Sequence, residues 1–234
     1  MNTRVILLDI EGTTSSIEYV YDVLFPYVRR EMPGYLSAHW DAPALRNACA
    51  KIAAEASRPE IAAQRDAIQA EVFRLMDTDV KSTGLKDLQG LVSQAGYESG
   101  SLRAHFYADV PPALQRWTQS GARCCVYSSG SIAAQKNFYR YANAGDLSHY
   151  IAANFDTTTG PKRERASYDA IAKALSVTPA TVTFYSDVTA ELDAARAAGM
   201  QTKLVTRPGN KPVPEGHGHR TITSFEQEVL PLAS

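Results

Sequence analysis

The sequence predicts an α/β fold, a doubly wound parallel sheet with a block of helices inserted after its first strand. Strand-like and helix-like segments alternate from about residue 110 onward, as in parallel sheets whose strands are joined by helices. Residues 18–102, in contrast, show helix patterns and no clear strand. We therefore expect a core domain of residues 1–17 and 103–234 and a helical insert of residues 18–102.

The first predicted strand, residues 4–9, ends in an acidic pair. Val5-Ile6-Leu7-Leu8 is an unbroken apolar run, typical of a strand buried on both faces. Asp9 and Glu11 follow, and side chains two positions apart on an extended chain point the same way. Both carboxylates would therefore face one site at the carboxyl end of a central strand, where open parallel sheets bind their ligands. The alternative is a solvated acidic turn.

The insert is predicted to contain several helices. One begins at Asp41-Ala42-Pro43, where a capping residue precedes an early proline. A second begins at Arg58-Pro59-Glu60. Its apolar residues share one stripe and are Ile61, Ile68, Val72 and Leu75. The apolar residues Leu85, Leu88, Leu91 and Val92 mark a third helix.

The later predicted strands are residues 123–127, 150–153, 181–185 and 202–205. Ser128 and Ser129 follow the first of these and would offer hydroxyl and backbone N–H groups to an anion. Ordinary capping of a helix that starts near Ser131 is the alternative. Asp187 follows the strand at 181–185 and would join a metal site, or else cap the next helix.

Lys162 stands just before a helix predicted to begin near Arg163. A lysine is unfavourable beside the positive end of a helix dipole unless an anion lies between them. A solvated basic loop is the alternative.

Composition excludes several functions. The formal net charge of -1 gives no electrostatic footprint for nucleic acid or an anionic membrane, and no apolar run is long enough to span a bilayer. The chain starts directly with a strand, so we expect no signal peptide. Cys49, Cys124 and Cys125 lack paired spacing and predict reduced thiols in the cytoplasm. His217-Gly218-His219 has no further ligands nearby and is interpreted as a solvated loop.

The order of these motifs resembles that of the haloacid dehalogenase superfamily, with an acid pair, then Ser-Ser, then Lys, then Asp, each after a strand. The segments 9–14, 85–90, 127–131 and 186–188 are similar to the enolase-phosphatases of methionine salvage, and the likeness covers nearly the whole chain. Most members of the superfamily have Asp where this chain has Glu11, whereas the enolase-phosphatase group is similar to this chain in having Glu.

The resemblance implies a magnesium-dependent phosphomonoesterase with an aspartyl-phosphate intermediate. Asp9 would attack phosphorus, and Glu11 would protonate the leaving oxygen and later activate water. One Mg²⁺ per chain would be held by Asp9, Glu11 and Asp187, since hard oxygen ligands suit this ion. Lys162 would neutralise the phosphoryl oxygens.

Ser128 and Ser129 would hold the phosphate, together with Lys162. The implied substrate is 2,3-diketo-5-methylthiopentyl 1-phosphate, which would enolise and then lose phosphate to give the acireductone 1,2-dihydroxy-3-keto-5-methylthiopentene. By the same resemblance the protein is a monomer, and the helical insert is a cap that closes over the site, excludes water and selects the leaving group.

Three alternatives stay open. Another magnesium-dependent phosphomonoesterase, acting on a sugar phosphate or nucleotide, would need the same motifs. A dehalogenase would have no phosphate charge to neutralise and would leave Glu11 and Asp187 unexplained. A non-catalytic binding module would lack at least one charged motif, whereas all four are present. The sequence identifies neither the base for enolisation nor the role of Glu191. Candidate substrate contacts outside the four motifs are Tyr19, Tyr21 and Lys86.

Overall fold

The computed structural model describes residues 4–78, 80 and 82–228. Six parallel strands form one sheet in the order β3-β2-β1-β4-β5-β6, with helices on both faces, so the predicted fold class is confirmed. The strands are β1 (Val5–Leu8), β2 (Arg123–Tyr127), β3 (Ile151–Phe155), β4 (Val182–Ser186), β5 (Gln201–Val205) and β6 (Arg220–Ile222). The first five lie within two residues of their predicted bounds at each end, and β6 was not predicted.

The central position of β1 follows from its apolar run. All four of its residues are buried, as expected for a strand covered on both faces. It pairs with β2 on one side and β4 on the other, and Leu8 lies opposite both Val126 and Tyr185. This register brings the residues that follow β1, β2 and β4 to the same edge of the sheet.

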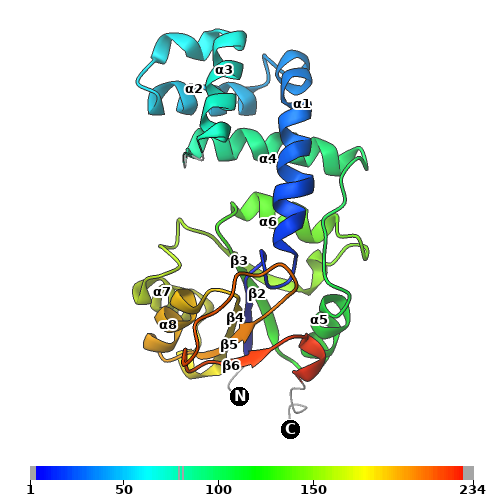
Figure 1. The fold of residues 1–234 in the computed structure, drawn as a ribbon, viewed down its shortest axis with the longest axis vertical. Helices are drawn as coiled ribbons and strands as arrows, with labels where there is room; N and C mark the ends of the chain where they lie inside the picture. The colour runs from blue at the N-terminus through cyan, green and yellow to red at the C-terminus, as the bar shows by residue number, and fades with distance from the viewer. Residues whose placement is uncertain (1–3, 79, 81, 229–234) are drawn as a thin grey trace. The chain divides into compact units, whose positions relative to one another are not determined.

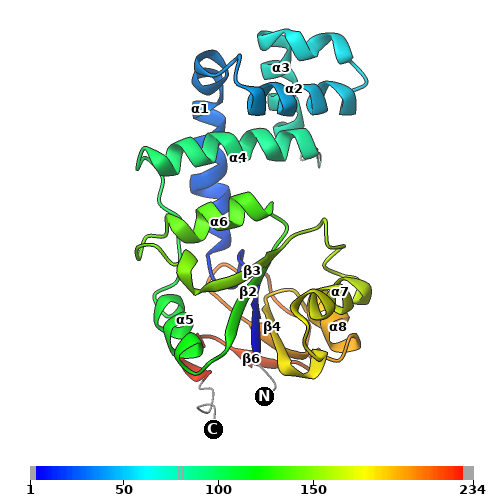
Figure 2. The same cartoon turned by 180° about the vertical axis from the view of Figure 1, so that it is seen from behind.

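Two helices cover each face of the sheet. Helices α5 (Val110–Gln119) and α6 (Ile132–Arg140) lie on one face, and α7 (Arg165–Leu175) and α8 (Thr189–Ala197) lie on the other (Figures 1 and 2). On the α7–α8 face the core contains Tyr127, Tyr168, Phe184 and Leu192. These apolar contacts anchor the helices whose first turns border the site.

The N-termini of α6, α7 and α8 can be compared with the predicted helix starts. Helix α6 begins at Ile132, near its predicted start, and the side chain of Ser131 caps it by accepting a hydrogen bond from the backbone N–H of Ala134. Helix α7 begins at Arg165, slightly later than predicted. Val188 is the N-cap of α8, so the alternative interpretation of Asp187 as that cap is wrong.

Residues Tyr21–Leu102 form one compact unit, and Met1–Val20 with Arg103–Ser234 form the other. In its described part, the first of these contains helices and no strand. A π-helical segment (Tyr19–Leu24) leads into α1 (Phe25–Ala38), followed by α2 (Pro43–Glu55), a 3-10 turn (Pro59–Ala63), α3 (Arg65–Asp77) and α4 (Thr83–Glu98). A cap function for this unit stays a prediction.

Two details of the predicted insert are wrong. Helix α2 does begin at Pro43, but its N-cap is Ala42 and not Asp41. The helix expected from Arg58 onward is broken, because Gln64 is extended between the 3-10 turn and α3. Its predicted apolar stripe is nevertheless buried on both sides of the break.

The structure places the three cysteines and His219 in buried positions. Cys49, Cys124 and Cys125 are buried and unpaired, and burial raises the pKa of Cys125 to about 11. The solvated-loop interpretation is wrong for His219, which is buried and has Nε2 3.1 Å from Asp193 Oδ1 and Nδ1 2.8 Å from Thr202 Oγ1. Across the described residues, every helix is too short or too polar to cross a membrane.

Candidate active site

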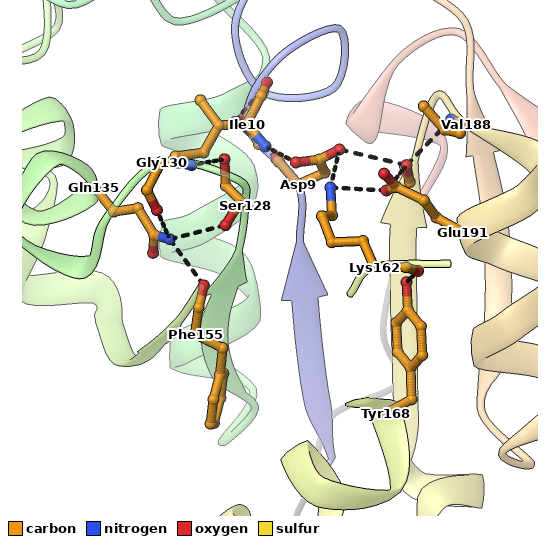
Figure 3. Close-up of polar contacts among 12 residues, drawn as sticks. Asp9, Ile10, Ser128, Gly130, Gln135, Phe155, Lys162, Tyr168, Val188 and Glu191 are labelled. Atoms are coloured by element: carbon orange, nitrogen blue, oxygen red, sulfur yellow. Dashed lines mark hydrogen bonds and ion pairs between the residues drawn. The ribbon is translucent and has the colours of Figure 1, made fainter. Parts of the chain in front are cut away.

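Asp9 lies directly after the buried central strand, at the edge where β1, β2 and β4 end. Its side chain is almost fully buried, and its Oδ2 is 2.7 Å from Nζ of Lys162. The hydroxyl oxygen of Ser186, the last residue of β4, lies 3.4 Å from this oxygen. Figure 3 shows Asp9 between the β2 side of the site, with Ser128, and the side that carries Lys162. The carboxylate is thus fixed and paired with a cation.

Lys162 is a buried cation and not part of a solvated loop. It is only 7% exposed, and Nζ is 2.7 Å from both Asp9 Oδ2 and Glu191 Oε2. Burial alone would lower the pKa of Lys162, but attraction to Asp9 and Glu191 exceeds that effect and leaves its pKa raised. The lysine therefore remains a fixed positive charge beside Asp9.

The loop that carries Lys162 is held by three side-chain hydroxyls. Tyr127 donates to the carbonyl of Gly160 at 2.8 Å, Ser167 to that of Pro161 at 2.7 Å, and Tyr168 to that of Lys162 at 2.7 Å. Tyr127 and Tyr168 are fully buried in the core below. Three consecutive carbonyls thus have partners in the body of the domain, which fixes the position of the lysine.

Glu191, whose role the sequence left open, is buried in the first turn of α8. It accepts a hydrogen bond from Ser186 Oγ at 3.0 Å as well as the ion pair with Lys162. Burial and the charge of Asp9 raise the pKa of Glu191. Glu191 is therefore part of the same polar network as Asp9, and not a surface residue.

Glu11 and Asp187 flank Asp9. Burial, followed by the charge of Asp9, raises the pKa of Glu11 and raises that of Asp187 to about 7. Gly12 lies against Asp187 with φ +70°, and an added Cβ would overlap the carboxylate. Glycine is thus required at position 12 because the backbone is left-handed there and because Asp187 leaves no room for a side chain.

The two predicted phosphate-binding serines differ in exposure. Ser128, just after β2, is buried, and Ser129 is exposed. The Oγ of Ser128 accepts a long hydrogen bond, 3.5 Å, from the N–H of Gly130. These residues form a turn between β2 and α6, on the opposite side of Asp9 from Lys162 (Figure 3).

Comparison with known proteins gives a consistent family. The model of a family of haloacid dehalogenase-like hydrolases matches residues 3–199. The "Enolase-phosphatase E1" of Stenotrophomonas maltophilia is 44% identical over 235 residues, covering 98% of this chain and all of that protein. The protein of the same name from Sorangium cellulosum is 47% identical and covers 88% of this chain and 89% of its own length. The chain belongs to the enolase-phosphatase family of haloacid dehalogenase-like hydrolases.

Solved structures agree with this family. The UTR4 protein of Saccharomyces cerevisiae has 36% sequence identity and a TM-score of 0.82, covering 97% of this chain and all of that one. A dehalogenase covering 96% of this chain and 95% of its own has only 16% identity and a TM-score of 0.57, a likeness that shows the fold alone. As an enolase-phosphatase family member the chain is a phosphatase enzyme, so the interpretation as a non-catalytic binding module is wrong.

The acidic cluster at this site fits a hard cation. Asp9, Glu11, Asp187 and Glu191 lie near the ammonium of Lys162, and burial, followed by repulsion from Asp9, raises the pKa of Asp187. Within the described residues no three His, Cys, Asp or Glu side chains converge as a metal-binding group. Mg²⁺ commonly uses one or two carboxylates and completes its shell with water and phosphate oxygens. Asp9 and Asp187 are carboxylates of this kind, and a magnesium site formed by Asp9, Glu11 and Asp187 stays a prediction.

Two residues that were not predicted hold the loop after Glu11. Arg207 is buried, donates from Nε to the carbonyl of Thr13 at 3.1 Å, and pairs with Asp109 at 2.9 Å. The side-chain amide of Asn210 donates to the carbonyl of Gly12 at 2.9 Å. Both follow β5, so the strand-end rule that found the other motifs, applied to this strand, would have found them.

Proposed function

We propose that the chain converts 2,3-diketo-5-methylthiopentyl 1-phosphate, through an enol phosphate, to the acireductone 1,2-dihydroxy-3-keto-5-methylthiopentene. The observation that supports this most is the buried ion pair of Asp9 with Lys162, at the edge of the sheet where three strands end. It supplies a fixed carboxylate for attack on phosphorus and a fixed cation for the phosphoryl oxygens. The relatives' names support an enolase and a phosphatase activity, and the substrate itself is what the resemblance to the enolase-phosphatases of methionine salvage implies.

The phosphoryl chemistry takes two displacements at phosphorus. A carboxylate oxygen of Asp9 attacks phosphorus, the ester P–O bond breaks, and Glu11 gives a proton to the leaving oxygen. Water then attacks the aspartyl-phosphate at phosphorus, Glu11 takes its proton, and the Asp9 carboxylate is regenerated. The raised pKa of Glu11 suits a group that exchanges a proton in each step.

The remaining residues bind and orient the phosphate. Lys162 balances the charge of its oxygens, and Ser128 and Ser129 supply hydroxyl and N–H donors from the other side of Asp9. A Mg²⁺ ion held by Asp9 and Asp187 would screen the repulsion between the nucleophile and the dianionic phosphate and polarise the phosphoryl group.

Replacing Asp9 by Asn separates the two half-reactions. The amide is nearly isosteric but cannot attack phosphorus, whereas enolisation requires only loss of a proton beside a carbonyl. With the diketo phosphate and excess Mg²⁺, Asp9→Asn is expected to accumulate a conjugated ultraviolet chromophore and to release no free phosphate. Circular dichroism should show that the variant is folded.

Two results would reject parts of this proposal. If Asp9→Asn releases phosphate at the wild-type rate, Asp9 is not the nucleophile. If the wild type cleaves sugar phosphates or nucleotides far better than the diketo phosphate and forms no enol, the alternative phosphomonoesterase function is correct.

The monomeric state stays a prediction, which light scattering can test. The cytoplasmic location also stays a prediction, which cell fractionation can test.

A further inference from the structure

Gln135 is a buried amide in α6, behind the turn formed by Ser128, Ser129 and Gly130. Its side chain is 1% exposed. Its Nε2 donates to the carbonyl of Gly130 at 2.9 Å and to that of Phe155 at 2.8 Å, with the carbonyl of Ser128 further away at 3.4 Å (Figure 3). The two short bonds use both hydrogens of the amide.

Two further contacts fix this arrangement. Asn154 on β3 donates to Oε1 of Gln135 at 3.0 Å, which places the amide nitrogen of Gln135 toward the turn. The carbonyl of Phe155 also accepts the backbone N–H of Ser128 at 3.3 Å. Gln135 therefore ties the turn to the ends of β2 and β3 at one point.

The direction of these carbonyls determines the direction of the neighbouring N–H groups. In a planar trans peptide the C=O and N–H groups point in opposite directions. Because the carbonyls of Ser128 and Gly130 point toward Gln135, the N–H groups of Ser129 and Ser131 point away from it. Neither N–H takes part in a backbone–backbone hydrogen bond among the described residues. Both point to the side of the turn opposite Gln135, where an anion would bind.

We infer that Gln135 is the positioning residue of the phosphate-binding turn. By holding the carbonyl of Gly130 inward, with that of Ser128 3.4 Å away, it presents backbone N–H groups, together with the Ser128 hydroxyl, to the phosphate. Gln135 itself does not touch the substrate. This inference rests on the proposed phosphatase function and adds to it the group that sets the geometry of phosphate binding.

Gln135→Met tests the inference, because Met has a similar length and cannot donate a hydrogen bond. The measurements are the inhibition constant of inorganic phosphate and the KM and kcat of phosphate release. Without its anchor the turn loses its preset geometry, so both the inhibition constant and KM should rise on the order of tenfold, with a smaller change in kcat. The Mg²⁺ concentration for half-maximal activity should not change, because Asp9 and Asp187 follow other strands.

A matched control separates positioning from stability. Trp117→Phe removes another buried side-chain hydrogen bond to a carbonyl, from Nε1 to Glu228 at 3.3 Å, and should lower Tm without altering phosphate inhibition. If Gln135→Met does not fold, Asn154→Leu removes the group that orients the amide and should weaken phosphate binding in the same direction.

The inference is overturned if a folded Gln135→Met protein keeps the wild-type phosphate inhibition constant and KM. If only Asn154→Leu folds, the same result in that variant overturns it. Either result leaves the phosphatase function in place. A wild-type protein that neither binds inorganic phosphate nor releases it from any phosphomonoester would overturn both.

Discussion

At the scale of single residues, the main feature is a lysine buried with two carboxylates. Removing an ammonium group from water costs several kcal/mol, and close partners with good geometry recover that cost. Lys162 has two such partners, Asp9 and Glu191, both at 2.7 Å. Its charge is thus held in place before the substrate arrives, so binding a phosphate requires no rearrangement of the lysine.

Replacing Lys162 tests this charge directly. Loss of one stabilising contact to a developing charge typically costs roughly 2.7–4 kcal/mol, or about 10²–10³ in rate. Lys162→Ala should reduce kcat for phosphate release by that factor. Lys162→Arg should also be impaired, because a planar guanidinium does not replace a point charge that two carboxylates share. Near-normal kinetics of the alanine variant would mean that Lys162 only fills a buried position.

Single residues could be predicted where they follow a strand. Asp9, Glu11, Ser128 and Asp187 were found because polar side chains after buried strands converge at one edge of a parallel sheet. Gln135 could not be found in this way, because it lies inside a helix and acts on backbone carbonyls. The spacing of such contacts depends on how the turn folds back over the helix, which the sequence pattern does not encode.

At the scale of elements, contacts with the core fix the conformation of the loop before α7, residues 160–162. Gly160 has φ +149°, which only glycine adopts readily, and an added Cβ would overlap the hydroxyl of Ser167. Together with the hydroxyls of Tyr127, Ser167 and Tyr168, this conformation aims Lys162 at Asp9. The loop therefore depends on the core beneath it.

Tyr168→Phe should loosen this loop. The variant keeps the buried ring and removes only the hydrogen bond to the carbonyl of Lys162, with a net stability cost of about 1 kcal/mol. Steady-state kinetics should show a loss of kcat on the order of tenfold, smaller than that of Lys162→Ala. Tyr185→Phe is the matched control, since it removes a buried hydroxyl that donates to Glu228 at 2.8 Å and should affect Tm more than kcat. Equal losses of kcat in the two variants would contradict a specific role of the loop.

Helices and strands with strong patterns could be predicted, and their interruptions could not. The apolar stripe from Ile61 to Leu75 has helical spacing, yet Gln64 breaks it into two elements that bury the same stripe. Strand β6 is only three residues long and lies at the edge of the sheet. Such short elements are stabilised by tertiary contacts more than by local preference, so periodicity does not reveal them.

At the scale of the whole molecule, the parallel sheet concentrates negative charge at one edge. The chain has a formal net charge of only -1, but four carboxylates lie near a single buried lysine at the carboxyl ends of the strands. This local excess destabilises the fold unless a cation binds. Composition alone could not reveal it, because the excess arises from strand order and not from residue counts.

Mg²⁺ should therefore stabilise the whole protein. A ligand that binds only the folded state adds about 2.7 kcal/mol at roughly 100 times its dissociation constant, equivalent to a rise in Tm of roughly 5–10 °C for a chain of this size. Thermal unfolding should show this rise for the wild type and little or none for Asp187→Asn. Sodium chloride at matched ionic strength is the control. An equal Mg²⁺-dependent rise in the variant would mean that the ion binds elsewhere.

The stereochemical course at phosphorus tests the two-step mechanism at Asp9 most directly. A phosphomonoester substrate made chiral with ¹⁶O, ¹⁷O and ¹⁸O is cleaved by the wild-type enzyme, with the phosphoryl group transferred to an acceptor alcohol for analysis. Each displacement at phosphorus inverts its configuration, so passage through an aspartyl-phosphate predicts net retention. Net inversion would show a single direct displacement and would contradict Asp9 as the nucleophile.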